Sequence, residues 1–130
     1  MLVIVTPMKF LFNMTIIKEK IPTEHHEQAL LIQWFRRFYP KVLIHSIPNG
    51  GHRSMSTAIA LKVEGTVKGI PDLFVPAWHL WIEMKRIKGG VLSPDQKEII
   101  SYLESVGYTV IVGKGCEDAK EKILQFNIEK

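Results

Sequence analysis

Apolar residues recur at helical spacing in several stretches of the chain. In "EHHEQALLIQWFRRFYP" they repeat every three or four positions, with Thr23 as the expected N-cap and Pro40 as the end. Residues 55–65 suit a short helix, and residues 117–126 suit a final amphipathic helix. These stretches predict three helices, the second of them closed by Gly65.

A fourth helix, over residues 92–107, has the clearest signature. Ser93 is its N-cap and Pro94 takes the first helical position. Gln96 stands three residues after the N-cap and completes a capping box, while Gly107 ends the helix. The spacing therefore assigns Gln96 a structural role before any functional one.

Four other stretches are typical of strands, at residues 41–47, 71–76, 79–86 and 108–113. A Gly-rich loop at residues 48–54 and a short turn at residues 76–78 interrupt them. The order of elements is α-β-α-β-β-α-β-α, which predicts an α/β fold with a mixed central sheet flanked by helices. The crossover helix should make the last two strands parallel.

The N-terminal residues 1–22 are apolar but do not form a spanning segment. Pro7 and Lys9 interrupt them, and the run falls short of the roughly 20 residues that a membrane helix needs. Two interpretations stay open: an edge strand or partner-facing arm, or an uninformative extension. Residues 23–130 are expected to form one domain, and no membrane partner is expected.

Composition adds three constraints. A chain of 130 residues with 46% hydrophobic content is typical of one globular domain. A net charge of +4 favours, weakly, a polyanionic partner such as nucleic acid. The single Cys116 excludes an internal disulfide framework and fits a reducing cytoplasm.

The hairpin at residues 69–86 contains charges where a core is expected. Side chains alternate faces along a strand, so Glu83 and Lys85 should project together, about 7 Å apart. Asp72 begins the preceding strand, and a tight turn would return it to Glu83. Charged groups are rarely buried unless they are paired or bind a metal.

Two converging carboxylates raise each other's pKa unless a cation is present, and such oxygen-rich sites suit Mg²⁺ or Mn²⁺. A nearby lysine can orient water or neutralise charge on a phosphate. Together they suggest metal-dependent hydrolysis of a phosphodiester. The alternative is a structural salt bridge between Lys85 and either acid at a sheet edge, although an exposed edge would be more polar than residues 73–84.

"GIPDLFVP", "WIEMKRIKGG" and "LSPDQKEIISYLESVGYTVIV", together with "EHHEQALLIQWFRRFYP" and "IPNGGHRS", resemble the VRR-Nuc domain of the PD-(D/E)xK nuclease superfamily. The likeness covers about residues 24–125. It implies a restriction-endonuclease-like core and a metal-dependent DNA endonuclease. It also implies action on branched DNA such as four-way (Holliday) junctions, often as a homodimer. Stand-alone members of this kind are frequently phage-encoded, so a bacterial or phage-infected cell is expected.

The resemblance carries over to individual residues. Asp72 matches the metal-binding Asp of the PD motif, and Glu83 and Lys85 match the E and K of ExK. The backbone carbonyl of Met84 is implied as a further metal ligand. The family also has a Glu upstream of a Gln in its first helix, a position that Glu24 or Glu27 can fill. Glu24 is favoured by its spacing from the Gln.

Further candidates are weighed against structural roles. Gln96 is implied to face the active site, in addition to its place in the capping box. Asn49, His52 and Arg53 lie in the Gly-rich loop, where polar groups can meet phosphates, or they form a plain solvated turn. Lys88 precedes two glycines and is a fourth candidate DNA contact.

Three rival interpretations remain at this stage. The first is a homodimeric endonuclease, with the N-terminal arm and the aromatic first helix as candidate dimer surfaces. The second is a monomeric nickase or nonspecific nuclease. The third is a catalytically idle nucleic-acid-binding module. Trp78 is expected to pack in the core, to stack on a base or to form a dimer contact, and Cys116 is not expected to act as a nucleophile.

Overall fold

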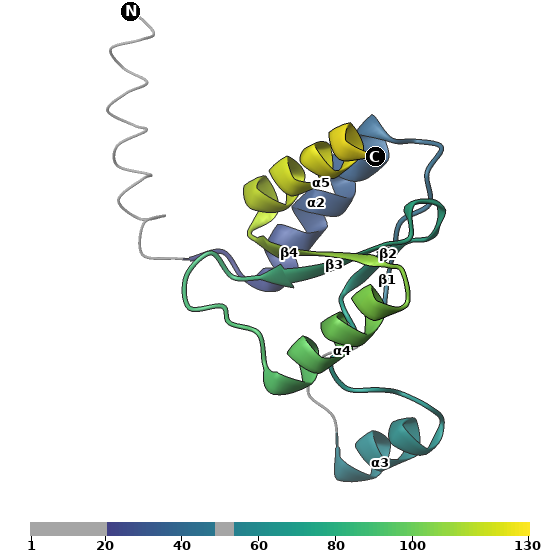
Figure 1. Cartoon of the computed structure of the whole chain (residues 1–130). Coiled ribbons are helices and arrows are strands. Elements are labelled where there is room, and N and C mark those ends of the chain that lie inside the picture. Colours follow the sequence, from purple (N-terminus) through teal and green to yellow (C-terminus); the bar gives the residue numbers. More distant parts are fainter. Residues whose placement is uncertain (1–20, 49–53) are drawn as a thin grey trace, which may run out of the picture.

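The computed structural model describes residues 21–48 and 54–130, so predictions for residues 1–20 and for Asn49, His52 and Arg53 fall outside it. The helices are α2 (Glu24–Phe38), α3 (Met55–Val63), α4 (Pro94–Ser105), α5 (Cys116–Glu129) and the short 3₁₀ helix η1 (Pro76–Trp78) (Figure 1). The strands are β1 (His45–Ser46), β2 (Leu73–Val75), β3 (Leu80–Lys85) and β4 (Thr109–Lys114).

The strands form one mixed sheet in the order β1-β2-β3-β4. The pairs β1/β2 and β2/β3 are antiparallel, whereas β3 and β4 are parallel. Helix α4 makes the crossover between the two parallel strands, as the pattern of elements predicted. The α/β class with a mixed sheet flanked by helices is confirmed.

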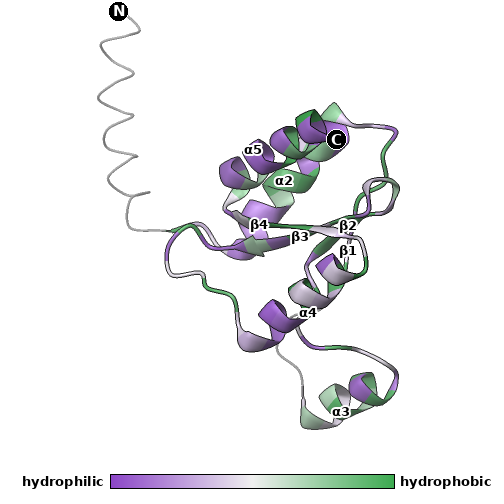
Figure 2. Cartoon of the chain, in the orientation of Figure 1, coloured by the Kyte–Doolittle hydropathy of each residue, from purple (hydrophilic) through white to green (hydrophobic). Residues whose placement is uncertain are grey.

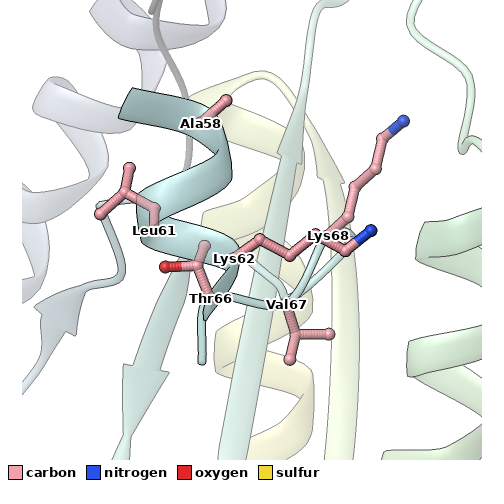
Figure 3. Close-up of a pocket in the computed structure, with 7 residues that line it drawn as sticks. Ala58, Leu61, Lys62, Thr66, Val67 and Lys68 are labelled. Atoms are coloured by element: carbon pink, nitrogen blue, oxygen red, sulfur yellow. The ribbon is translucent and has the colours of Figure 1, made fainter. Parts of the chain in front are cut away.

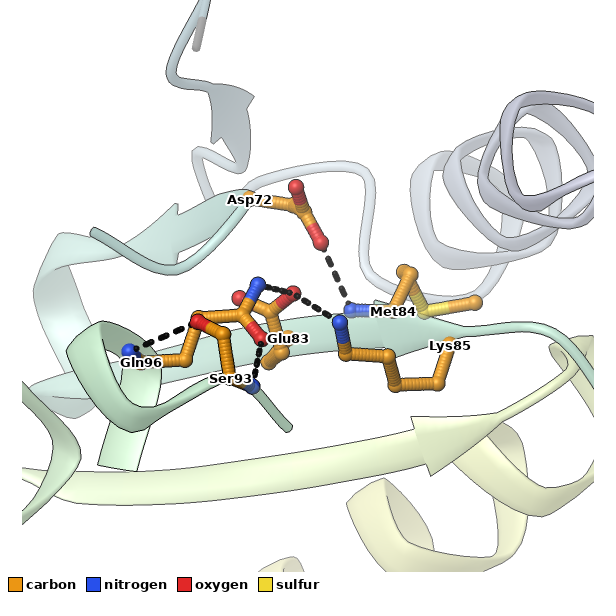
Figure 4. A network of polar contacts seen from close by, with 6 residues as sticks. All are labelled: Asp72, Glu83, Met84, Lys85, Ser93 and Gln96. Carbon is orange, nitrogen blue, oxygen red and sulfur yellow. Dashed lines mark hydrogen bonds and ion pairs between the residues drawn. The ribbon is translucent and has the colours of Figure 1, made fainter. Parts of the chain in front are cut away.

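Helices α2 and α5 lie together on one face of the sheet, and α4 lies on the other (Figure 1). Leu80, Ile82 and Met84 of β3 are fully buried and form one core with α2 and α5. Glu83 and Lys85 project from the opposite face of β3, toward α4. Figure 4 shows Gln96 of α4 in contact with Glu83 on that face. The alternation of β3 therefore separates an apolar face from a polar one.

Aromatic residues close the end of the sheet away from Lys85. The ring of Trp78 lies 5.3 Å from Phe35, 4.9 Å from Tyr39 and 6.2 Å from Phe126, measured between centroids. Trp78 is therefore a packing residue, and the aromatic face of α2 is turned inward. If α2 forms a dimer surface, as predicted, the contact would use its exposed apolar residues, such as Phe38, and not its inward aromatic face.

The strand predicted at residues 41–47 is wrong for its first half, since β1 contains only His45 and Ser46. The chain turns after α2, and the Val42 N–H donates to the Tyr39 carbonyl at 3.0 Å. Within that turn the Val42 N–H and the Tyr39 carbonyl bond to each other, so they are not available to pair with a neighbouring strand. The other predicted elements are present, and their ends shift by at most three residues.

Helix α3 stands apart from the sheet (Figure 1) and buries none of its residues. Its ribbon is largely apolar in hydropathy (Figure 2), and Met55, Ile59 and Val63 are exposed. Ser54 caps it by accepting the Thr57 N–H at 3.2 Å. Among the described residues, no helix has the length and apolar character to cross a membrane.

Candidate active site

The hairpin of β2 and β3 brings the two predicted carboxylates together. Helix η1 and the left-handed backbone of His79, with φ of 51°, reverse the chain between the strands. Leu73 then pairs with Ile82, which places Asp72 beside the end of β3. Asp72 Oδ2 accepts the Met84 N–H at 2.7 Å (Figure 4). The expected return of Asp72 toward Glu83 is confirmed.

Glu83 is the most deeply buried charged residue of this site, with 2% of its surface exposed. Its Oε2 accepts a hydrogen bond of 3.0 Å from Gln96 Nε2 and lies 3.8 Å from Lys85 Nζ (Figure 4). Its Oε1 is buried and has no hydrogen-bond partner among the described residues. A buried carboxylate oxygen without a partner is costly and marks a position for a bound cation or a proton.

The pKa of Glu83 is raised from 4.5 to about 8, and burial is the largest cause. The negative charge of Asp72 and the side-chain contact with its carboxyl also contribute to the rise, Lys85 opposes it, and Glu24 makes the smallest contribution. Two acids at one buried position favour a protonated Glu83 in the metal-free protein. A divalent cation at this position would reverse that preference, because it stabilises both carboxylates in their charged form.

Lys85 lies in an interior strand and is 8% exposed. The predicted alternative of a salt bridge at a sheet edge therefore fails on location, since β3 has partners on both sides. Its ammonium does pair with Glu83, at 3.8 Å, which is a long contact. That pair leaves Glu83 Oε1 unsatisfied, so it does not account for the whole site.

Gln96 combines the two roles that the sequence offered for it. Its backbone N–H donates to Ser93 Oγ at 3.2 Å, and its Oε1 accepts the Ser93 N–H at 2.9 Å. Because Oε1 is used as an acceptor, the amide can only present Nε2 to Glu83. The capping box thus sets the orientation of the amide that contacts the buried acid.

The two first-helix acids have different surroundings. Glu27 is 7% exposed, and its Oε1 accepts the Cys116 N–H at 2.6 Å, at the N-terminus of α5. Glu24 is half-exposed, and its charge raises the pKa of Glu83. Glu27 therefore has a structural partner, whereas Glu24 is the acid of α2 whose charge acts on Glu83.

The contact of Glu27 with α5 was not predicted, because its two partners lie 89 positions apart in the sequence. Gly115 makes it possible: its φ is +88°, and a Cβ there would lie 2.9 Å from Glu27 Oε1. Cys116 is buried, and burial raises the pKa of its thiol. A nucleophilic role for Cys116 is thereby disfavoured, as predicted.

The remaining predicted contacts are peripheral. Lys88 is exposed in the loop between β3 and α4.

A cavity of about 330 Å³ lies between α3 and the segment before β2 (Figure 3), and it is lined by Ala58, Leu61, Lys62, Thr66, Val67, Lys68 and Gly69. Since neither Asp72 nor Glu83 lines it, this cavity is separate from the site.

No protein-family model matches the chain. No curated protein matches it either. A solved structure titled "VRR_NUC domain protein" is similar, with a TM-score of 0.67 and 30% sequence identity. The likeness covers 82% of this chain and 89% of that one, so it extends over nearly the whole fold.

Proposed function

The chain belongs to the VRR-Nuc domain family, and from this premise we propose that it is a Mg²⁺- or Mn²⁺-dependent DNA endonuclease. Its substrate would be structured DNA, with four-way junctions foremost, and it would act as a homodimer. The observation that carries the proposal is the buried Glu83 between the partly buried Asp72 and the buried Lys85, with one Glu83 oxygen lacking a hydrogen-bond partner among the described residues. A nuclease needs such a site, whereas an idle binding module does not.

The residues of the site suit a hard divalent cation. Asp72, Glu83 and the Met84 carbonyl would hold it. That carbonyl lies on the same side of β3 as the Met84 N–H that contacts Asp72, because both groups of a strand residue face one neighbour. Mg²⁺ commonly takes one or two carboxylates and fills its remaining positions with water and substrate phosphate. When bound, the metal would activate water and polarise the phosphoryl oxygen.

The number of side-chain ligands is limited. Within residues 21–48 and 54–130, no three His, Cys, Asp or Glu side chains are grouped closely enough to hold a metal by themselves. We therefore place Glu24 in contact with a metal-bound water rather than in direct coordination. Its charge reaches Glu83, as the raised pKa indicates, which is consistent with such a position.

The other side chains have assigned tasks in the proposal. Lys85 would orient the attacking water and stabilise negative charge on the phosphate. Gln96 would hold Glu83 in place through its 3.0 Å hydrogen bond. The water oxygen would bond to phosphorus while the bond from phosphorus to the 3′ oxygen breaks, leaving a 5′-phosphate and a 3′-hydroxyl.

The homodimer part of the proposal draws on family resemblance and symmetry. A twofold dimer presents two identical sites, which suits symmetric cutting of two strands in a junction. The exposed apolar residues of α3, Met55, Ile59 and Val63, supply a surface that a second copy could cover. Light scattering of the purified protein would give its mass in solution.

A cleavage assay tests the reaction. The protein would be given labelled four-way junction, flap, duplex and single-stranded DNA of matched sequence, with Mg²⁺, Mn²⁺ or EDTA. We expect metal-dependent cutting of the junction, and none by Lys85→Ala. Cutting that persists in EDTA would contradict the mechanism. Equal cutting of linear duplex would contradict the substrate, and binding without cutting would favour the idle module.

A further inference from the structure

A second cavity adjoins the candidate active site on the α4 side of the sheet. Its volume is about 300 Å³, and it is lined by Lys85, Gly90, Val91, Leu92, Lys97, Val112 and Lys114. Three lysines and no acid line it, and we call it the lysine cavity. Lys85 lines the cavity and also contacts Glu83, so the cavity adjoins the site through this side chain.

Three different elements bring the lysines together. The parallel register of β3 and β4 pairs Lys85 with Lys114, so the last residues of the two strands lie side by side. Side chains at paired positions project from the same face of a sheet. The capped first turn of α4 adds Lys97, whose N–H donates to the Ser93 carbonyl at 3.0 Å. The positions of all three are therefore set by backbone contacts.

The two outer lysines, Lys97 and Lys114, form no ion pair among the described residues. Two nearby acids pair with other lysines: Asp95 with Lys68 at 3.5 Å, and Asp118 with Lys122 at 3.1 Å. Asp118 Oδ2 also accepts the Lys114 N–H at 2.8 Å, and the Lys114 charge interacts with that carboxylate, so the positive charge at Lys114 is offset only in part. Both lysine side chains are exposed, so a polyanion in solution can reach them. Clustered like charges repel, and a bound anion would relieve that repulsion.

We propose that the lysine cavity binds a backbone phosphate of the DNA strand next to the phosphate that is cut. The proposal rests on the nuclease function proposed above and adds a location for the neighbouring phosphate. Lysines contact phosphates as point charges and carry no sequence information. The cavity would therefore position the DNA strand so that the phosphate to be cut lies at Glu83, without selecting a base sequence.

Binding measurements in EDTA test this without any cleavage. Fluorescence anisotropy would follow a labelled four-way junction and a linear duplex over a range of salt concentrations, for wild type, Lys97→Ala, Lys114→Ala and the double variant. Because the cavity contacts one phosphate, the slope of log affinity against log salt should become shallower by about 0.9 in the double variant, and by less in each single variant. The loss of DNA affinity in each variant should be the same for junctions of different sequence.

Lys41→Ala is the matched control. Lys41 is equally exposed but follows α2, at the end of the sheet away from Lys85. Its removal should leave the slope within error. A double variant with the wild-type slope, or with no more change than Lys41→Ala, would overturn the proposal. Circular dichroism would show that the variants are folded, and Lys97→Glu with Lys114→Glu should lower affinity further.

The two proposals fail in different ways. If wild type binds DNA with the expected lysine dependence but cuts no substrate with any metal, the nuclease proposal fails and the phosphate subsite stands. If wild type cuts DNA and the double variant keeps both its salt slope and its KM, the subsite fails and the nuclease stands.

Discussion

Gln96 connects the first turn of α4 to the buried acid of β3. Its Nε2 donates to Glu83 Oε2 at 3.0 Å, while its Oε1 accepts the Ser93 N–H at 2.9 Å. The two groups of one amide are thus divided between a helix cap and the site. The start of α4 and the orientation of Glu83 depend on the same side chain.

Gln96→Glu should shift the pH dependence of cleavage. A glutamate keeps the acceptor for the Ser93 N–H, but it replaces a donor to Glu83 with a second negative charge. The pKa of Glu83 should rise, so the rate should reach half its maximum at a higher pH. Rate against pH, measured at one metal concentration below saturation so that protonation of Glu83 still competes with the metal, would check this.

Ser93→Ala is the control for that variant. It removes Oγ from the cap but keeps the backbone N–H that orients the Gln96 amide. Loss of the cap should lower the free energy of unfolding by about 1 kcal/mol. The pH profile of cleavage should not move. An unchanged profile in Gln96→Glu would contradict the proposed coupling.

The stability of the metal-free protein should fall as pH rises from 4.5 toward 8, because the folded-state pKa of Glu83 is raised from 4.5 to about 8. Over that interval folded Glu83 keeps a proton that the unfolded chain has released, so the raised pKa stabilises the fold most below 4.5. Urea unfolding in EDTA at several pH values would measure the free energy of unfolding. Glu83→Gln should make this free energy less dependent on pH. The same pH dependence in Glu83→Gln as in wild type would show that another group is responsible.

Metal binding should release a proton from Glu83. A cation needs the carboxylate form, so affinity for Mg²⁺ should rise with pH and level off above about 8. Calorimetry in two buffers of different ionisation enthalpy would count the protons released. Glu83→Gln should bind Mg²⁺ more weakly and release none. Affinity that is independent of pH would contradict the assignment of Glu83 as a ligand.

Substitutions in α2 separate the two candidate acids. Glu27→Ala leaves the buried Cys116 N–H without its acceptor, which should cost about 1–3 kcal/mol of unfolding free energy. Glu27→Gln keeps an amide oxygen there and should cost less. Glu24→Ala should reduce cleavage with little change in stability, since Glu24 is half-exposed. Cleavage lost in folded Glu27→Gln but kept in Glu24→Ala would reverse the assignment.

Much of the fold and part of the site follow from local patterns. The capping box joins Ser93 and Gln96, which are three positions apart, so its spacing predicted it and the structure contains it. The shared face of Glu83 and Lys85 follows from the two-residue period of any strand. The turn at residues 76–78 then required Asp72 to return toward them. Each of these features depends on neighbours that are close in sequence.

The sequence by itself determined which residues alternate, where most helices begin and which charges share a face, because backbone geometry sets these over a few residues. Tertiary structure alone decided that Glu27 accepts the first N–H of α5, that Gln96 reaches Glu83 and that Lys114 stands beside Lys85. It also decided how deeply Glu83 is buried, and hence its pKa. Such contacts depend on strand register and helix packing, which join segments with no local pattern in common.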